Sequence, residues 1–82
     1  MPKLRRLNGK DVVTLLEEMG FSVIRIRGSH HIMRRMVDDL PQTVNVPVHG
    51  SKPLATGMLR RLYRDLQRYI PEDDLRPHFY TD

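Results

Sequence analysis

A chain of 82 residues forms one small domain and buries too little surface to enclose a large catalytic cavity, so any chemistry must lie on an open face. The absence of cysteine excludes a disulfide framework and a thiolate zinc site. The formal net charge is +4, and no apolar run is long enough for a transmembrane span or a signal peptide, so we expect a cytoplasmic protein.

The positive charge is concentrated in the middle of the chain. Residues 20–70 carry nine Lys or Arg against three Asp or Glu, whereas Glu72, Asp73 and Asp74 offset this balance near the C-terminus. A basic region of this kind attracts nucleic acid without sequence specificity. The alternative is ordinary solubilising charge, but the regular spacing of the basic residues favours nucleic-acid contact.

Asn8 is predicted to cap a first helix, with Asp11 three residues later as the acid of a capping box. Apolar residues then follow at helical spacing, at Val12, Leu15, Leu16 and Met19. Gly20 predicts the end of this helix, because glycine readily adopts the left-handed conformation of the residue after a helix.

Two strands are predicted around a two-residue turn. Residues 21–27 are rich in β-branched and aromatic side chains, and Gly28-Ser29 fits a type II′ turn with glycine first. Residues 30–37 then form the returning strand of a hairpin.

A third strand is predicted over residues 43–48, where valines alternate along one face. A longer connection over residues 38–42, which contains Leu40 and Pro41, separates it from the second strand. Pro47 lacks an amide proton, which predicts that this strand lies at an edge of the sheet or ends there.

Residues 49–55 form a loop before the second helix, for which Thr56 is the predicted N-cap. Its apolar face is formed by Leu59, Leu62, Tyr63, Leu66 and Ile70, and Pro71 ends it. The predicted fold class is α+β, in the order α-β-β-β-α, with a three-stranded antiparallel sheet and two helices on one face. We assign residues 1–70 to one domain and residues 71–82 to an acidic C-terminal tail that forms another turn or frays.

The register of the hairpin decides which of two adjacent histidines faces the solvent, since successive strand residues point to opposite sides. If the turn contains only Gly28 and Ser29, the predicted cross-strand pairs are Arg27–His30, Ile26–His31, Arg25–Ile32 and Ile24–Met33. The face that the helices can cover then carries Ile24, Ile26, His31 and Met33. The open face carries Arg25, Arg27, His30 and Arg34. His30 is therefore the preferred catalytic candidate and His31 the second choice, and a slip of one residue would exchange them.

A basic ridge is predicted along the second helix, where three arginines recur every four residues: Arg60, Arg64 and Arg68. Arg61 lies beside them, and Lys52 lies in the loop before the helix. Such a ridge can bind a phosphate backbone by charge and bidentate hydrogen bonds. The alternative, equally supported by spacing alone, is a solvated helix face with Asp65 as a local partner.

Four short motifs occur in a specific order: GF at residues 20–21, RGSHHI at 27–32, VPVHGSK at 46–52 and GMLRRL at 57–62. Together they resemble the HicA toxin family, the small mRNA interferases of HicAB toxin–antitoxin systems. The similarity extends over residues 7–70.

The resemblance implies a double-stranded-RNA-binding-domain-like fold, ribosome-independent cleavage of mRNA, arrest of translation and neutralisation by a partner antitoxin, HicB. It also implies that one histidine of the GSHH motif is catalytic, which corresponds to His30 or, in members with another residue at the first position, to His31. Ser29 and His49 are accessory candidates, and for His49 a structural position at the strand end is at least as well supported as a share in catalysis.

The expected reaction is attack of a ribose 2′-hydroxyl on the adjacent phosphate, with His30 as base or acid. The basic side chains expected to bind RNA are Arg25, Arg27, Arg34, Lys52, Arg60, Arg64 and Arg68. Among these, Arg25, Arg27, Arg34 or Lys52 is expected to stabilise the negative charge of the transition state. We expect no metal ion and no cofactor, because the acids are dispersed and the adjacent histidines point apart. The alternatives are a non-catalytic RNA-binding module of the same fold and a protein-interaction domain whose arginines meet an acidic partner.

Overall fold

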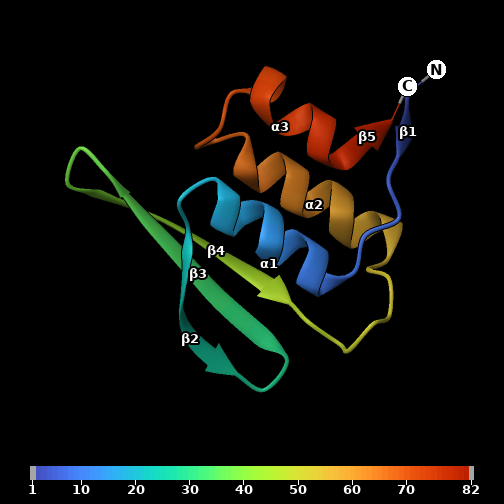
Figure 1. Ribbon diagram of the computed structural model, residues 1–82, viewed down its shortest axis with the longest axis horizontal. Helices are drawn as coiled ribbons and strands as arrows, with labels where there is room; N and C mark the ends of the chain where they lie inside the picture. The colour runs from blue at the N-terminus through green and yellow to red at the C-terminus, as the bar shows by residue number, and fades with distance from the viewer. Residues whose placement is uncertain (1, 82) are drawn as a thin grey trace.

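The two predicted helices lie against one face of a three-stranded antiparallel sheet (Figure 1). The computed structural model describes residues 2–81. In this part of the chain the sheet has the order β2-β3-β4, formed by Ser22–Arg27, His30–Val37 and Leu40–Pro47. Helix α1 (Gly9–Glu18) contacts β2 and β4, and helix α2 (Thr56–Leu66) contacts β4. The predicted α+β class and the order α-β-β-β-α are confirmed.

The core lies between the sheet and the helices and contains only apolar side chains and one tyrosine. Its buried members are Val12, Leu15, Leu16, Phe21, Met33, Val44, Val46, Leu59, Leu62, Tyr63, Leu66, Ile70, Leu75 and Phe79. Across residues 2–81, no helix has the length and apolar composition that a membrane crossing requires.

Helix α1 begins with the predicted capping box. The Asn8 Oδ1 atom accepts a hydrogen bond from the Asp11 amide at 2.8 Å, and the Asp11 carboxylate accepts one from the Asn8 amide at 2.9 Å. These bonds satisfy two amides that a helix leaves without intrahelical partners. Gly20 follows the helix with a φ of 96°, a conformation that glycine adopts without steric cost.

Gly9 allows the start of α1 to touch the end of β4. A Cβ atom at this position would overlap with the Pro47 carbonyl oxygen and would lie 2.7 Å from the Val48 Cα. Both neighbours are backbone atoms, which cannot move aside without shifting the strand. The contact therefore requires glycine and sets the distance between α1 and the sheet.

The first hairpin has the predicted two-residue turn. Gly28 has a φ of 58° and Ser29 does not adopt a positive φ, as a type II′ turn requires. The predicted pairs at the turn are confirmed, namely Arg27–His30, Ile26–His31 and Arg25–Ile32.

The next predicted pair of this hairpin, Ile24–Met33, is wrong. A bulge at Ile24 shifts the register so that Val23 lies opposite Met33. One extra residue in a strand leaves its side chain out of the alternating pattern. Ile24 is therefore 49% exposed, and Ile26 is 60% exposed because the helices do not reach the end of β2.

The second hairpin is tighter than predicted. Strand β4 begins at Leu40, so residues 40–42 belong to the strand and the connection consists of Asp38 and Asp39 alone. Both aspartates have positive φ values, 52° and 65°, as in a type I′ turn. The tip projects beyond the helices (Figure 1), and β4 is an edge strand, as Pro47 predicted.

Helix α2 differs from the prediction at both ends. Its N-cap is Ala55, which makes no side-chain capping bond, and Thr56 is the first helical residue instead of the cap. The helix ends at Leu66 and not at Ile70, since a turn follows in which the amides of Tyr69 and Ile70 both bond to the Leu66 carbonyl. Ile70 is still buried in the core as predicted.

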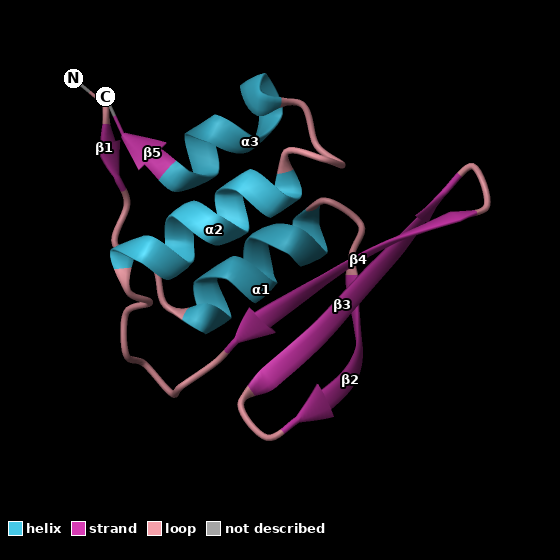
Figure 2. Cartoon of the chain, turned by 180° about the vertical axis from the view of Figure 1, so that it is seen from behind, coloured by secondary structure: helices cyan, strands magenta, loops and turns pink. Residues whose placement is uncertain are grey.

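The C-terminal segment, whose conformation the sequence left open, forms a third helix. Helix α3 (Glu72–Phe79) packs on α2 and buries Leu75 and Phe79 completely. Strand β5 (Tyr80–Thr81) then pairs with β1 (Lys3–Leu4), so both ends of the described chain lie side by side (Figure 2). This segment is thus part of the same core.

Arg35 connects the sheet to the ends of both main helices. Its guanidinium donates hydrogen bonds to the carbonyl oxygens of Met19 at 2.9 Å and Tyr69 at 3.1 Å, and it lies 4.9 Å from the centre of the Phe21 ring. Met19 is the C-cap of α1, where a positive charge stabilises the negative end of the helix dipole, and Tyr69 lies in the turn that follows α2. The charged group of Arg35 therefore has a structural role in the fold.

We expect the substitution Gly9→Ala to lower the free energy of unfolding by about 1–3 kcal/mol, because the added methyl group overlaps with strand backbone. Gly57→Ala is the matched control in the first turn of α2, where a Cβ would meet no atom within 4 Å. It should raise stability by about 0.4–1 kcal/mol. Urea denaturation measures both. A Gly9→Ala protein as stable as the wild type would contradict the close approach of α1 to β4.

Tyr63 joins α2 to the C-terminal segment. Its contacts there make the stability of the protein depend on pH in the alkaline range. Its hydroxyl donates to the Glu72 carboxylate at 3.0 Å, and its ring packs edge-to-face on Phe79 and Tyr80. Burial, and then the hydrogen bond and the charge of Glu72, raise the pKa of Tyr63 above 10.0. The unfolded chain therefore loses this proton first, so the stability that Tyr63 contributes is present below pH 10 and is lost as the pH rises through the raised pKa. Urea denaturation from about pH 8 to 11.5 should show a steeper loss in the wild type than in Tyr63→Phe, and parallel curves would refute the assignment.

Candidate active site

His30 lies on the open face of the sheet at the start of β3. It is exposed, and its cross-strand neighbours are Arg27 on β2 and Pro47 on β4. His31 points to the other side, between Ile26 and the fully buried Val46. It is half-buried, and its Nδ1 atom has no hydrogen-bond partner in residues 2–81. Of the two histidines, His30 is the more exposed.

The ring of His30 is held by an asparagine on the neighbouring strand. Its Nδ1 atom lies 3.1 Å from the Oδ1 atom of Asn45. Asn45 is opposite Ile32, two residues further along β3, so the two side chains meet diagonally on the same face. Sequence reasoning missed Asn45, whose only signal was its position between Val44 and Val46 in an alternating strand.

A groove of about 270 Å³ opens beside His30, where the edge strand β4 meets α2. We call it the His30 groove. Its polar side chains are His30, Thr43 and Asn45 from the sheet and Arg61, Asp65 and Arg68 from α2 or the turn after it. Its apolar part includes Met58, Leu62 and Tyr69. The groove therefore places one histidine opposite two arginines that follow it by more than thirty positions in the chain.

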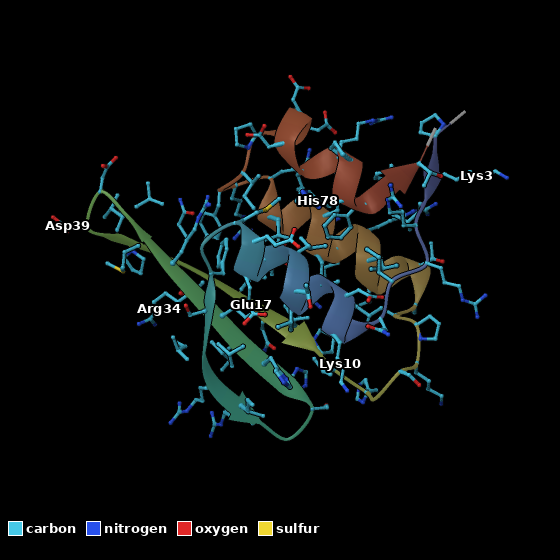
Figure 3. All side chains as sticks on the ribbon, viewed as in Figure 1. Lys3, Lys10, Glu17, Arg34, Asp39 and His78 are labelled. Carbon is cyan, nitrogen blue, oxygen red and sulfur yellow. The ribbon has the colours of Figure 1, made fainter. Side chains whose placement is uncertain are left out.

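The arginines predicted on the open face of the hairpin lie there. Arg25, Arg27 and Arg34 are exposed, and Arg34 projects outward from β3 (Figure 3). The Arg34 Nε atom donates to the Thr43 hydroxyl at 3.3 Å. Of these arginines, Arg27 is the direct cross-strand neighbour of His30, and the other two lie further along the same face.

The predicted ridge on α2 divides into two groups. Arg60, Arg64 and Arg68 are all exposed, but only Arg68 lines the His30 groove. Arg61 lines it as well, because seven residues make two helical turns and bring it to the same side as Arg68. Its Nε atom lies 3.9 Å from the Asp65 carboxylate, an exposed pair that contributes little stability.

The accessory candidates lie at the end of β4. The Ser29 carbonyl accepts a hydrogen bond from the Val48 amide at 2.6 Å, which ties the first turn to the third strand. His49 and Lys52 line a neighbouring hollow of about 440 Å³. Pro47 and Met58 border both this hollow and the His30 groove, so Lys52 lies close to the candidate site without entering it.

The titratable side chains of this region are dispersed. Residues 2–81 contain no group of three or more His, Cys, Asp or Glu side chains that could hold a metal ion. The arrangement consists of one exposed imidazole with an amide partner, a cross-strand arginine at Arg27, and Arg61 and Arg68 in the same groove. Such a site can exchange a proton and stabilise negative charge on a phosphate.

A comparison with known protein families tests the resemblance that the sequence motifs indicate. Residues 9–67 match the family described as "HicA toxin of bacterial toxin-antitoxin", which is more than half of the 82 residues. The matched region extends from the start of α1 to the residue after α2 and includes His30, Asn45 and Arg61. No curated protein and no solved structure matches the chain. The resemblance is confirmed, and the chain belongs to the HicA family of toxins of bacterial toxin–antitoxin systems.

Proposed function

We propose that this toxin is a metal-independent endoribonuclease that cleaves mRNA in the cytoplasm and arrests translation, with His30 as its catalytic residue. The observation that carries the proposal is the exposed imidazole of His30 in a groove faced by Arg61 and Arg68. An open groove suits a polymer, which a small chain could not enclose. His31, the second choice, is half-buried on the other face of the sheet, and its Nδ1 atom is buried.

The reaction is attack of a ribose 2′-oxygen on the adjacent phosphorus. His30 removes the 2′-hydroxyl proton, the new oxygen–phosphorus bond forms, and the bond to the 5′-oxygen breaks as that oxygen takes up a proton. The products are a 2′,3′-cyclic phosphate and a 5′-hydroxyl end. Extra negative charge develops on the phosphate oxygens in between, and nearby guanidinium groups stabilise it.

The basic side chains have different places in this proposal. Arg61 and Arg68 bind the phosphates next to the cleaved bond, since they share the groove with His30. Arg25, Arg27 and Arg34 bind the strand as it crosses the hairpin, and Lys52 binds it beyond Pro47. Arg60 and Arg64 are exposed outside the groove and attract RNA by charge alone. Ser29 and His49 support the shape of the site.

The partner that neutralises this toxin is a HicB-type antitoxin. In the simplest mode of inhibition, acidic or polar side chains of the antitoxin cover His30 and the neighbouring arginines and keep RNA out of the groove. A structure of the complex with the His30 groove open to solvent would exclude this mode of inhibition.

We expect the pure toxin to cleave labelled RNA in excess EDTA and to leave 2′,3′-cyclic phosphate ends. His30→Ala should cleave about 10²–10⁴-fold more slowly, because an acid–base group is lost, while it still binds RNA. His78→Ala is the control, since this histidine lies on α3, outside the groove (Figure 3). RNA that the wild type binds but leaves intact would indicate a non-catalytic RNA-binding module. The absence of any salt-sensitive RNA binding would indicate a protein-interaction domain, and undiminished cleavage by His30→Ala would refute the role of His30.

Two paired variants test whether the groove or general charge binds RNA. Arg61→Gln with Arg68→Gln, and Arg60→Gln with Arg64→Gln, each remove two positive charges from the same helical region. If the groove holds two phosphates, the first pair should lower the slope of log affinity against log salt by about 1.4, as expected for single-stranded nucleic acid. The second pair should lower it clearly less. Equal losses in filter-binding titrations would show that the groove has no special part in binding.

A further inference from the structure

Asn45 contacts the ring of the proposed catalytic residue, His30. Its side chain is the one hydrogen-bond partner of the His30 ring among residues 2–81, at 3.1 Å from Nδ1, and the other ring nitrogen, Nε2, has no partner there. The two nitrogens of a neutral imidazole have different roles, because one carries the proton and the other has the free lone pair. Whatever binds Nδ1 therefore decides which nitrogen is the base.

The position of Asn45 is set by the core and not by the histidine. Its neighbours Val44 and Val46 are 7% and 0% exposed, so alternation along β4 forces the Asn45 side chain onto the open face. The bond between the Val48 amide and the Ser29 carbonyl holds the end of β4 against the first turn. The amide oxygen is thus brought to His30 by the same strand that packs the core.

The chemistry of the contact depends on the amide oxygen. An oxygen has no proton to donate, so it can bind Nδ1 only when this nitrogen carries a proton. The neutral ring is then the Nδ1–H tautomer, with the lone pair on Nε2. Free imidazole side chains favour the opposite tautomer, with the proton on Nε2, so the contact reverses an intrinsic preference.

We infer that Asn45 is a positioning residue that holds His30 in its Nδ1–H tautomer and so makes Nε2 the atom that takes the proton from RNA. The inference rests on the proposed function for its catalytic meaning, whereas the tautomer itself is a property of the free protein. In this role Asn45 acts through the His30 ring, which is the side chain that it contacts. It also accepts a hydrogen bond from the imidazolium that forms once Nε2 has been protonated.

Long-range ¹H–¹⁵N correlation spectra of the uniformly ¹⁵N-labelled chain test the tautomer directly. They are recorded at alkaline pH, where histidine rings are neutral. We expect His30 to be mainly the Nδ1–H form in the wild type and to revert to mainly Nε2–H in Asn45→Leu, a change in the tautomer ratio of about fivefold or more. Asn45→Asp keeps an acceptor oxygen and should retain the Nδ1–H form. The signals of His49 and His78 should not move, which provides an internal control.

The matching kinetic experiment measures cleavage and RNA binding by Asn45→Leu. If the lone pair must lie on Nε2, the cleavage rate should fall about tenfold or more, with RNA retention within about twofold of the wild type. A purely structural role would instead lower the urea midpoint and leave the tautomer ratio unchanged.

The two experiments separate the inference from the proposed function. A wild-type His30 that is mainly Nε2–H, or a ratio that Asn45→Leu does not alter, overturns the inference even if the protein cleaves RNA. A changed tautomer with undiminished cleavage overturns the positioning role. If the wild type cleaves no RNA, the proposed function fails, and the tautomer measurement still decides whether Asn45 controls the ring.

Discussion

The register of the first hairpin is the constraint on which the candidate site depends. A two-residue turn at Gly28 and Ser29 pairs Arg27 with His30, and alternation then assigns every later residue of β3 to one side of the sheet. A slip of one residue would bring His31 to the open face and turn His30 toward the helices. The Ser29 carbonyl also binds the Val48 amide, so the same turn holds the third strand in place. One short turn therefore orders all three strands around the imidazole.

Alternation along β3 also gives two neighbouring arginines different tasks. Arg34 lies on the open face, the same face as His30, whereas Arg35 lies on the covered face and binds the carbonyls of Met19 at the end of α1 and Tyr69 in the turn after α2. The bond to Met19 satisfies an acceptor at the end of α1 that has no partner within the helix, and the bond to Tyr69 holds the turn after α2. The number of basic residues therefore overstates the surface available to nucleic acid, because one of them, Arg35, joins the sheet to the helices.

The His30 groove lies at the boundary between the sheet and α2, and neither element forms it alone. The core side chains Leu62 and Leu66 hold α2 against the sheet, and this docking sets where Arg61 and Arg68 lie relative to His30. Stability and the site are thus coupled, since a change that loosens α2 also moves the guanidinium groups. For a chain too small to enclose a substrate, such a boundary is where side chains from distant segments can converge on one phosphate.

The sequence by itself determined the features that depend on residues close together in the chain: the capping box of α1, the Gly28-Ser29 turn, the pairing at His30 and the order of the main elements. The start of β4 predicted from the sequence was wrong, because Asp38 and Asp39 form a tight turn that lacks the glycine typical of such turns. Only the tertiary structure decided the fold of the C-terminal helix, the limits of α2 and the convergence of Asn45 and Arg61 on His30. Caps and tight turns are stabilised by local hydrogen bonds that a short motif reveals. Contacts between distant elements depend instead on how the whole core packs, and no local sequence pattern specifies how those elements approach one another.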